Sequence, residues 1–285
     1  MKKILALTLA ALVSACGSDK KEKPITYGAA QAPTATEQSA AAGAATSLQA
    51  NLSYQTSSQP TSGAAGLGDQ LASSLGGSTV STKTASPSAK LAGPALREAF
   101  DTSGLDPACV TTAQSGNVTT ATWGAAAPCH VVVSSSNPTT GDAMTMTVDV
   151  SGTLTWDPTQ GLTAWDIGER YAMDMTSGGQ HVTADGTAHL GGSLKVDAST
   201  ITVNETSSID MTTHAMGLTI PEGLVTTLAG TVGYQASPFC ITSGTLTVEQ
   251  RWTQRPIGAT DQTLPNQGWR FDWTGCGAFT VAHGS

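Results

Sequence analysis

The sequence has few charged residues, and few basic ones in particular. Its 285 residues include 13 Lys and Arg and 21 Asp and Glu, so only 12% are charged and the net charge is −8. A typical soluble domain has about 25% charged residues. Beyond residue 90 there are six basic and 17 acidic residues, and Lys195 is the only lysine. Binding to nucleic acid needs clustered Lys and Arg to neutralise phosphates, so the composition excludes a nucleic-acid partner.

The motifs of the common enzyme and metal-binding classes are also absent. The sequence contains no G-x-S-x-G, P-loop or H-E-x-x-H motif. Its cysteines show no C-x-x-C spacing, which structural zinc sites and redox-active pairs use. We therefore expect no metal, no cofactor and a non-catalytic role. A hydrolase whose Ser, His and acid come together only by folding is an alternative.

The first 16 residues are typical of an export signal. Lys2 and Lys3 precede an apolar run over residues 4–13, which is too short for a membrane-spanning helix of about 20 residues. The run ends in the small residues Ser14 and Ala15, directly before Cys16. We predict that residues 1–15 are a signal peptide.

The small residues followed by Cys16 resemble the lipobox of bacterial lipoproteins. The resemblance implies cleavage before Cys16 and lipidation of its thiol and new amino group, so that a membrane is the partner. Several acyl chains give stable anchoring, whereas one chain would be marginal. In that family an Asp after the Cys favours the inner membrane, and this chain has Gly17, which implies the outer membrane. The alternative is an ordinary secretory signal followed by a cysteine by chance.

Residues 16–90 are predicted to be a low-complexity spacer. Ala, Ser, Thr, Gly and Gln dominate residues 24–90, and such a segment buries too little apolar surface to offset its chain entropy. One alternative is that residues 65–75 form a short helix docked on the following domain, because Leu67, Leu71 and Leu75 are four residues apart. Residues 94–100 also predict a short helix, with proline in its first turn.

Four cysteines follow the spacer. An even number of cysteines in an exported chain favours disulfides. Loop-closure entropy favours neighbours along the chain. Of the three possible pairings we therefore predict Cys109–Cys129 together with Cys240–Cys276.

Residues 143–215 predict four long strands. Apolar residues occupy the even positions of residues 143–156, the odd positions of 165–175, the even positions of 182–196 and the odd positions of 201–215. A period of two indicates strands with one buried face. Ser151-Gly152 could form a hairpin turn, but the apolar parity continues through Gly152, so we predict one strand bent at that glycine.

The same stretches predict a register in which large side chains lie opposite small ones. Trp165 then pairs with Gly192 on the next strand, and Leu190 pairs with Ser207 on the strand after it. The sequence Ser-Gly-Thr-Leu-Thr occurs at residues 151–155 and again at 243–247, which suggests a repeated bend.

We predict that residues 91–285 form a disulfide-containing all-β domain. Its mainly antiparallel sheet of about seven to ten long strands would curl into a half-barrel, barrel or sandwich after a disordered N-terminal spacer. Residues 110–122 and 130–134 predict further strands. A solenoid and an outer-membrane barrel are alternatives.

Candidate ligand-binding residues are few. Glu169 and Glu205 are the only acids on the apolar faces. The register separates them by about 15 Å, which exceeds the gap of about 6.5 to 9.5 Å between the carboxyls of inverting glycosidases. Each has either a structural role or a ligand contact. Trp269 and Trp273 could stack on a carbohydrate or pack in the core.

These features predict a membrane-anchored envelope lipoprotein with a non-catalytic domain for binding or structure. The first alternative is a carrier of lipid or another apolar ligand, because glycines and methionines on the inner face could leave a cavity. The second is the hydrolase. An apolar groove would favour the carrier, and a cleft that joins a His, an acid and a Ser would favour the hydrolase.

Overall fold

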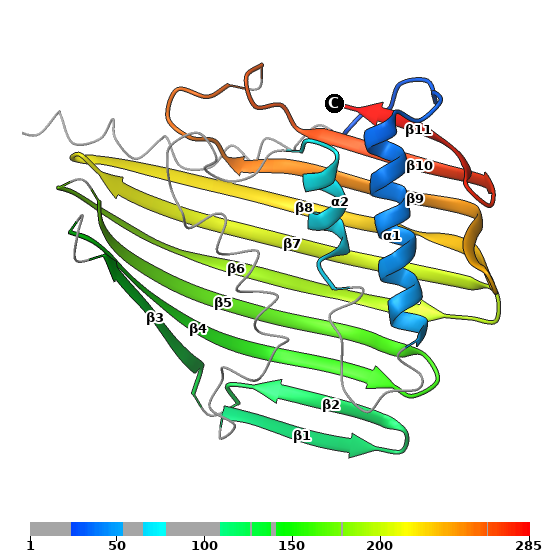
Figure 1. Cartoon of the computed structure of the whole chain (residues 1–285), viewed down its shortest axis with the longest axis horizontal. Helices are drawn as coiled ribbons and strands as arrows, with labels where there is room; N and C mark the ends of the chain where they lie inside the picture. The colour runs from blue at the N-terminus through cyan, green and yellow to red at the C-terminus, as the bar shows by residue number, and fades with distance from the viewer. Residues whose placement is uncertain are drawn as a thin grey trace, which may run out of the picture.

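The structure is a computed structural model, and it describes residues 24–53, 65–77, 109–125, 127–137, 141–177, 179–260 and 262–285. In these residues, eleven strands form one antiparallel sheet, and two helices cover one of its faces (Figure 1). The helices are α1 (Ala35–Ser53) and α2 (Leu67–Ser74). The strands are β1 (Val110–Ser115), β2 (Val118–Trp123), β3 (Cys129–Asn137), β4 (Asp142–Asp157), β5 (Gly161–Ser177), β6 (Gln180–Val196), β7 (Thr200–Ala215), β8 (Leu218–Ala236), β9 (Phe239–Gln254), β10 (Gln267–Gly275) and β11 (Ala278–Gly284).

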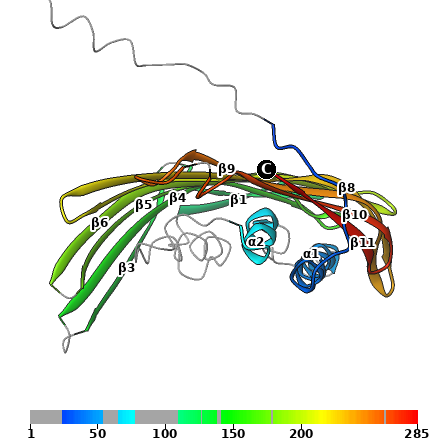
Figure 2. The same ribbon diagram turned by 90° about the horizontal axis from the view of Figure 1, so that it is seen from above.

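The sheet is open and curved. Its strand order is β1-β2-β4-β5-β6-β7-β8-β9-β10-β11, and β3 pairs with β4 beside this path. Seen from above, the sheet bends around α1 and α2, which lie on its concave side (Figure 2). The prediction of an all-β domain with a long-stranded, mainly antiparallel sheet is therefore confirmed, and of the three predicted shapes (half-barrel, barrel or sandwich) the open curved sheet corresponds to the half-barrel. The strand number exceeds the predicted range, in part because residues 110–122 fold as a short hairpin, β1 and β2, turned at Gly116.

The predicted registers are also confirmed. Trp165 pairs with Gly192 between β5 and β6, and Leu190 pairs with Ser207 between β6 and β7. A Cβ on Gly192 would overlap the Trp165 ring. The bulky ring therefore requires a glycine beside it, which explains why large-opposite-small pairing identifies the register.

Strand β4 runs unbroken through Gly152, as predicted. Gly152 has φ +144°, and a Cβ there would overlap the backbone oxygen of Asp166 on β5. Gly244, at the same place in the second Ser-Gly-Thr-Leu-Thr segment, has φ +95°, and its Cβ would overlap the backbone oxygen of Thr231. The two segments therefore mark the same local bend, which only glycine permits without strain.

The core lies between the concave face and the two helices. Helix α2 contacts β7, β8 and β9, and α1 contacts β5 and β9. Large side chains from both layers are less than 2% exposed, among them Leu48, Leu67, Trp165, Leu228, Leu246 and Phe271. The opposite, convex face of the central strands consists largely of exposed polar residues.

The helices limit the extent of the predicted spacer. Residues 35–53 and 67–74 belong to the folded domain, and the alternative of a docked helix over residues 65–75 is confirmed. Helix α1 packs through Ala40, Ala41, Ala44 and Leu48, which are at most 5% exposed. These small residues let the helix approach the sheet closely, although their composition resembles that of a flexible linker. The helix predicted over residues 94–100 lies outside the described residues, as does Cys16.

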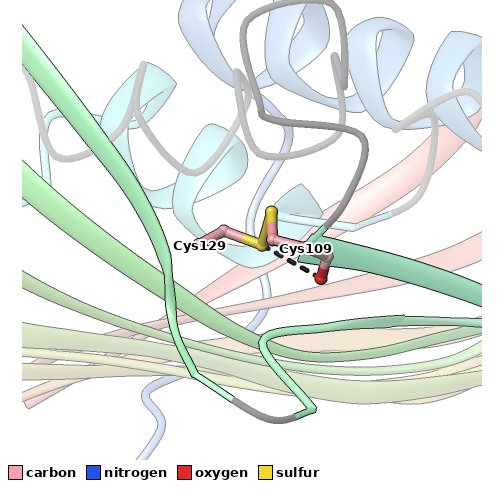
Figure 3. Close-up of a disulfide and its surroundings, with 2 residues drawn as sticks. All are labelled: Cys109 and Cys129. Carbon is pink, nitrogen blue, oxygen red and sulfur yellow. Dashed lines mark hydrogen bonds between the residues drawn. A yellow bond between two sulfur atoms is a disulfide. The ribbon is translucent and has the colours of Figure 1, made fainter.

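Both predicted disulfides are present, Cys109–Cys129 and Cys240–Cys276. Strands β2 and β3 pair with successive halves of the same edge of β4. Figure 3 shows the first disulfide, which joins the residue before β1 to the first residue of β3. The disulfide therefore links the β1–β2 hairpin to β3 at the point where β4 changes its pairing partner from β3 to β2.

Candidate functional site

Glu205 binds the N-terminus of α2. Its side chain lies on the concave face of β7 and is 4% exposed. The backbone N–H groups of Gly66 and Gly68 each donate to one of its carboxyl oxygens at 2.7 Å, and the Leu67 N–H also contributes. The first N–H groups of a helix have no partner within the helix, and they favour an anionic acceptor. Glu205 therefore has a structural role, as the acceptor that holds α2 on the sheet.

Further polar groups surround this contact. Burial raises the pKa of Glu205, and the Asp69 carboxylate adds to this rise. The stabilising N–H groups of α2 offset the rise only in part, so the resulting pKa is about 8. Asp69 of α2 is hydrogen-bonded to the hydroxyls of Ser207 and Thr226, although burial still raises its pKa. Gln250 donates to the Thr226 hydroxyl at 3.3 Å. The apolar concave face thus includes a polar patch that is occupied by the start of α2.

Helix α1 is tied to the sheet at both ends. Thr34 and Glu37 form a capping box, in which the Thr34 N–H donates to the Glu37 carboxylate and the Glu37 N–H donates to the Thr34 hydroxyl. Glu37 also contacts His283 of β11. At the other end, Asn51 donates to the Gln160 oxygen and accepts from the Leu162 N–H.

Glu37 is ionised within this arrangement. Burial raises the pKa of its carboxyl, but the Thr34 N–H, His283 and the Thr34 hydroxyl together outweigh burial, so the net pKa is lowered. The contact with His283 is therefore charge-assisted through the Glu37 carboxylate. Glu37 thus links the start of α1 to the last strand of the sheet.

Glu169 lies apart from Glu205. It pairs with Ala188 between β5 and β6, whereas Glu205 pairs with Gly192 between β6 and β7, as the register predicted. The two carboxylates are therefore separated by a strand and are not a catalytic pair. Glu169 is 4% exposed, and it shares the concave face of β5 with Tyr171, two residues further along.

A cavity of about 460 Å³ follows the cross-strand row of Tyr171, Gly186, Met211 and Glu222. Asp185, Asp210 and Arg170 also line it, so its walls combine polar and apolar surface. Tyr171 is 5% exposed, and its hydroxyl has no hydrogen-bond partner in the part of the chain that the structure describes. Burial raises the pKa of this phenol, and the nearby carboxylates of Asp210 and Asp185 raise it further.

Trp269 and Trp273 pack in the core at the β10 end of the sheet. Each is 7% exposed. The rings of Phe271, Trp273 and Phe279 form one cluster, in which both phenylalanine centroids lie 5.6 Å from that of Trp273 and 6.0 Å from each other. Packing accounts for both tryptophans, and little of either ring is exposed to contact a carbohydrate.

The histidines pair with acids on the exposed face. His181 lies 2.9 Å from Asp174, and His189 lies 2.6 Å from Asp166. His214 hydrogen-bonds the Thr219 hydroxyl at 3.1 Å, but it is 3.7 Å from the Asp185 carboxylate. Among the described residues, no group of three or more His, Cys, Asp or Glu is placed to hold a metal ion.

The sequence did not single out Tyr171 or Asp69 as members of a site. Tyr171 could have been found as the large residue opposite Gly186, and Asp69 as the acid within the Leu67, Leu71 and Leu75 pattern.

No helix within the described ranges is long and apolar enough to cross a bilayer. No family model matches the chain, and searches of curated proteins and of solved structures return no match.

Proposed function

We propose that this protein is a lipoprotein of the bacterial cell envelope, anchored by lipidated Cys16, with a non-catalytic binding or structural β domain. The observation that carries this proposal is the lipobox-like sequence at the head of a chain whose folded part begins soon after it. Tyr27 already pairs with Gly284 at the end of β11. The domain is therefore held near the membrane, and Gly17 favours the outer membrane.

Two substitutions test the anchor. Cys16→Ser should release the protein from the membrane fraction and leave its amino terminus without acyl chains in intact-mass measurements. Gly17→Asp should keep the acyl chains and move the protein to the inner membrane of a Gram-negative host. Membrane retention of unacylated Cys16→Ser protein would overturn the anchor.

A second candidate function is a carrier of lipid or another apolar ligand. The observation that favours it is the helical cover, which we define as α1 and α2. Three of the four buried apolar residues of α1 are alanines, and an alanine methyl buries far less apolar area than a leucine side chain. The attachment of this cover therefore depends on the polar contacts of Glu37, Asn51 and Glu205 as well as on its buried leucines. Such a cover can separate from the apolar residues of the concave face without disrupting the sheet.

The carrier is tested by mass spectrometry of lipid extracted from purified Cys16→Ser protein. This variant has no acyl chains of its own, so any fatty acid found comes from a bound ligand. Stoichiometric lipid would establish the carrier, and protein free of lipid after purification without detergent would count against it. The membrane anchor is tested separately and does not depend on this result.

A further inference from the structure

Three exposed apolar side chains lie at one end of the sheet. Met216 is 75% exposed and Leu218 55% exposed, in the turn between β7 and β8, and Ile257 is 71% exposed in the connection between β9 and β10. Since neighbouring strands are antiparallel, β7 and β9 run in the same direction, and both connections lie at the same end of the sheet, on the left in Figure 1. We call Met216, Leu218 and Ile257 the apolar rim.

Met216 is in a backbone conformation that disfavours methionine. Ala215 pairs with Leu218, so Met216 and Gly217 form a two-residue hairpin turn, with φ +51° and +77°. Such turns strongly prefer Asn or Asp followed by Gly. Met216 is the one non-glycine residue with positive φ in the described ranges. Neither turn chemistry nor core packing accounts for an exposed methionine there, which points to a contact outside the domain.

The anchor can bring this rim to the bilayer. Tyr27 follows Cys16 by eleven residue steps, which can span at most about 40 Å. Tyr27 pairs with Gly284, and successive pairings across β10, β9 and β8 place Gly284 on the same row as Thr206 of β7. From Thr206 the strand continues for ten residues to Met216, or about 33 Å. The tether is therefore long enough for the rim to reach the membrane that holds Cys16.

The charge distribution favours a zwitterionic lipid surface. Residues 211–221, which include the hairpin tip, contain no Asp, Glu, Lys or Arg. An uncharged tip avoids the cost of bringing ionised groups to the acyl region. Beyond residue 90 the chain is acidic, so anionic lipids would repel it, and no basic cluster attracts them.

We propose that the apolar rim inserts into the surface of the bilayer in which Cys16 is anchored. The inference rests on the proposed lipid anchor, which keeps the rim close to the membrane. Three apolar side chains alone give weak binding, but tethering makes the second contact intramolecular and raises its effective concentration. Together the two contacts orient the sheet with its β7–β8 hairpin toward the lipid.

Fluorescence quenching by brominated phosphatidylcholine tests this contact. The full lipidated chain is reconstituted in vesicles as the Leu218→Trp variant, and the emission added to that of the native tryptophans is measured. Ala198→Trp is the matched control, because Ala198 is exposed in the β6–β7 turn at the opposite end of the sheet. We expect several-fold stronger quenching at position 218 than at position 198.

A second variant keeps the test independent of the added tryptophan. Met216→Asn combined with Leu218→Thr supplies the residues that this hairpin prefers, so it should fold at least as well as the parent chain. On a Cys16→Ser background it should bind neutral phosphatidylcholine vesicles several-fold more weakly than Cys16→Ser alone.

The outcomes separate the two proposals. Equal quenching at positions 218 and 198 in protein that is lipidated and bound to vesicles would overturn rim insertion and leave the anchor standing. A mature chain without acyl groups would overturn the proposed function instead. Protection of the rim in cells but not in pure lipid vesicles would indicate a protein partner and would also overturn the lipid contact.

Discussion

The buried carboxyl of Glu205 should make the attachment of α2 depend on pH. Burial raises its pKa from 4.5 to about 8, despite the opposing N–H groups of α2. The folded protein therefore holds a proton that the unfolded chain releases near pH 4.5. Because this pKa is raised on folding, the contribution of Glu205 to the free energy of unfolding is complete below pH 4.5 and is lost as the pH rises to 8. Between pH 5 and pH 9 the loss amounts to about 4 kcal/mol, at about 1.4 kcal/mol for each pH unit up to the folded pKa.

Glu205→Gln should remove the part of this dependence that Glu205 contributes, because the amide does not titrate. Urea unfolding at pH 5 and pH 9 measures the free energy of unfolding, and amide exchange of residues 67–74, corrected for intrinsic rates, detects separate opening of α2. The raised pKa of Asp69 adds a slope of the same sign, which Glu205→Gln leaves in place. Glu37 does not interfere, because its pKa is lowered and its contribution is lost only below about 4.5.

Glu249→Gln is the matched control, because Glu249 is a half-buried acid of the same sheet that accepts hydrogen bonds from Tyr27 and Arg251. It should keep the pH dependence of the parent chain. The reasoning would be refuted if Glu205→Gln retained the full difference between pH 5 and pH 9, both in unfolding and in the exchange of α2. The slope would then arise from another group.

Three further changes can be measured by urea unfolding. Gly152→Ala should cost about 2 to 3 kcal/mol, because its Cβ would overlap a backbone oxygen of β5 at a positive φ; a cost no greater than that of Gly168→Ala, where a Cβ would make only ordinary van der Waals contacts, would contradict this. Replacing Cys109 and Cys129 together by Ala should cost about 3 kcal/mol for a separation of 20 residues, and a loss below about 1 kcal/mol would contradict the loop-entropy estimate. Tyr171→Phe should stabilise the protein by about 1 kcal/mol, because it removes a buried hydroxyl without a partner among the described residues; destabilisation would show that the hydroxyl has a favourable contact.

Strands β4 to β7 were predictable because each leaves a local pattern in the sequence. A strand buried on one face alternates apolar and polar residues over its whole length, and these four strands are 16 or 17 residues long. The register followed from two bulky rings, Trp165 and Tyr171, each of which lies over a glycine of β6. The disulfide pairing followed from proximity along the chain.

The helical cover and the role of Glu205 left much weaker signals. Three of the four buried apolar residues of α1 are alanines, and small residues are also common on its outward face, so no apolar stripe stands out. Glu205 appeared as an isolated acid on an apolar face because its partner, the Gly68 N–H, lies 137 residues away in sequence. A pairing between a side chain and the start of a distant helix has no local pattern, and only the fold brings the two together.

The polar contacts of the cover also set the size of ligand that a carrier would need. Besides its buried leucines, Leu48, Leu67 and Leu71, three polar contacts hold it, through Glu37, Asn51 and Glu205. A net loss of about 2 kcal/mol for each polar contact on opening sets a lower bound of about 6 kcal/mol on what the ligand must supply. At about 25 cal/mol per Å² this corresponds to about 240 Å² of apolar surface, or about eight buried methylene groups. A single long acyl chain meets this requirement, and a small apolar molecule such as a short-chain alcohol does not. Fatty acids of increasing length, added to Cys16→Ser protein, should therefore accelerate amide exchange in α1 only beyond about eight carbons, and acceleration by shorter chains would show that the cover is held less firmly than its contacts imply.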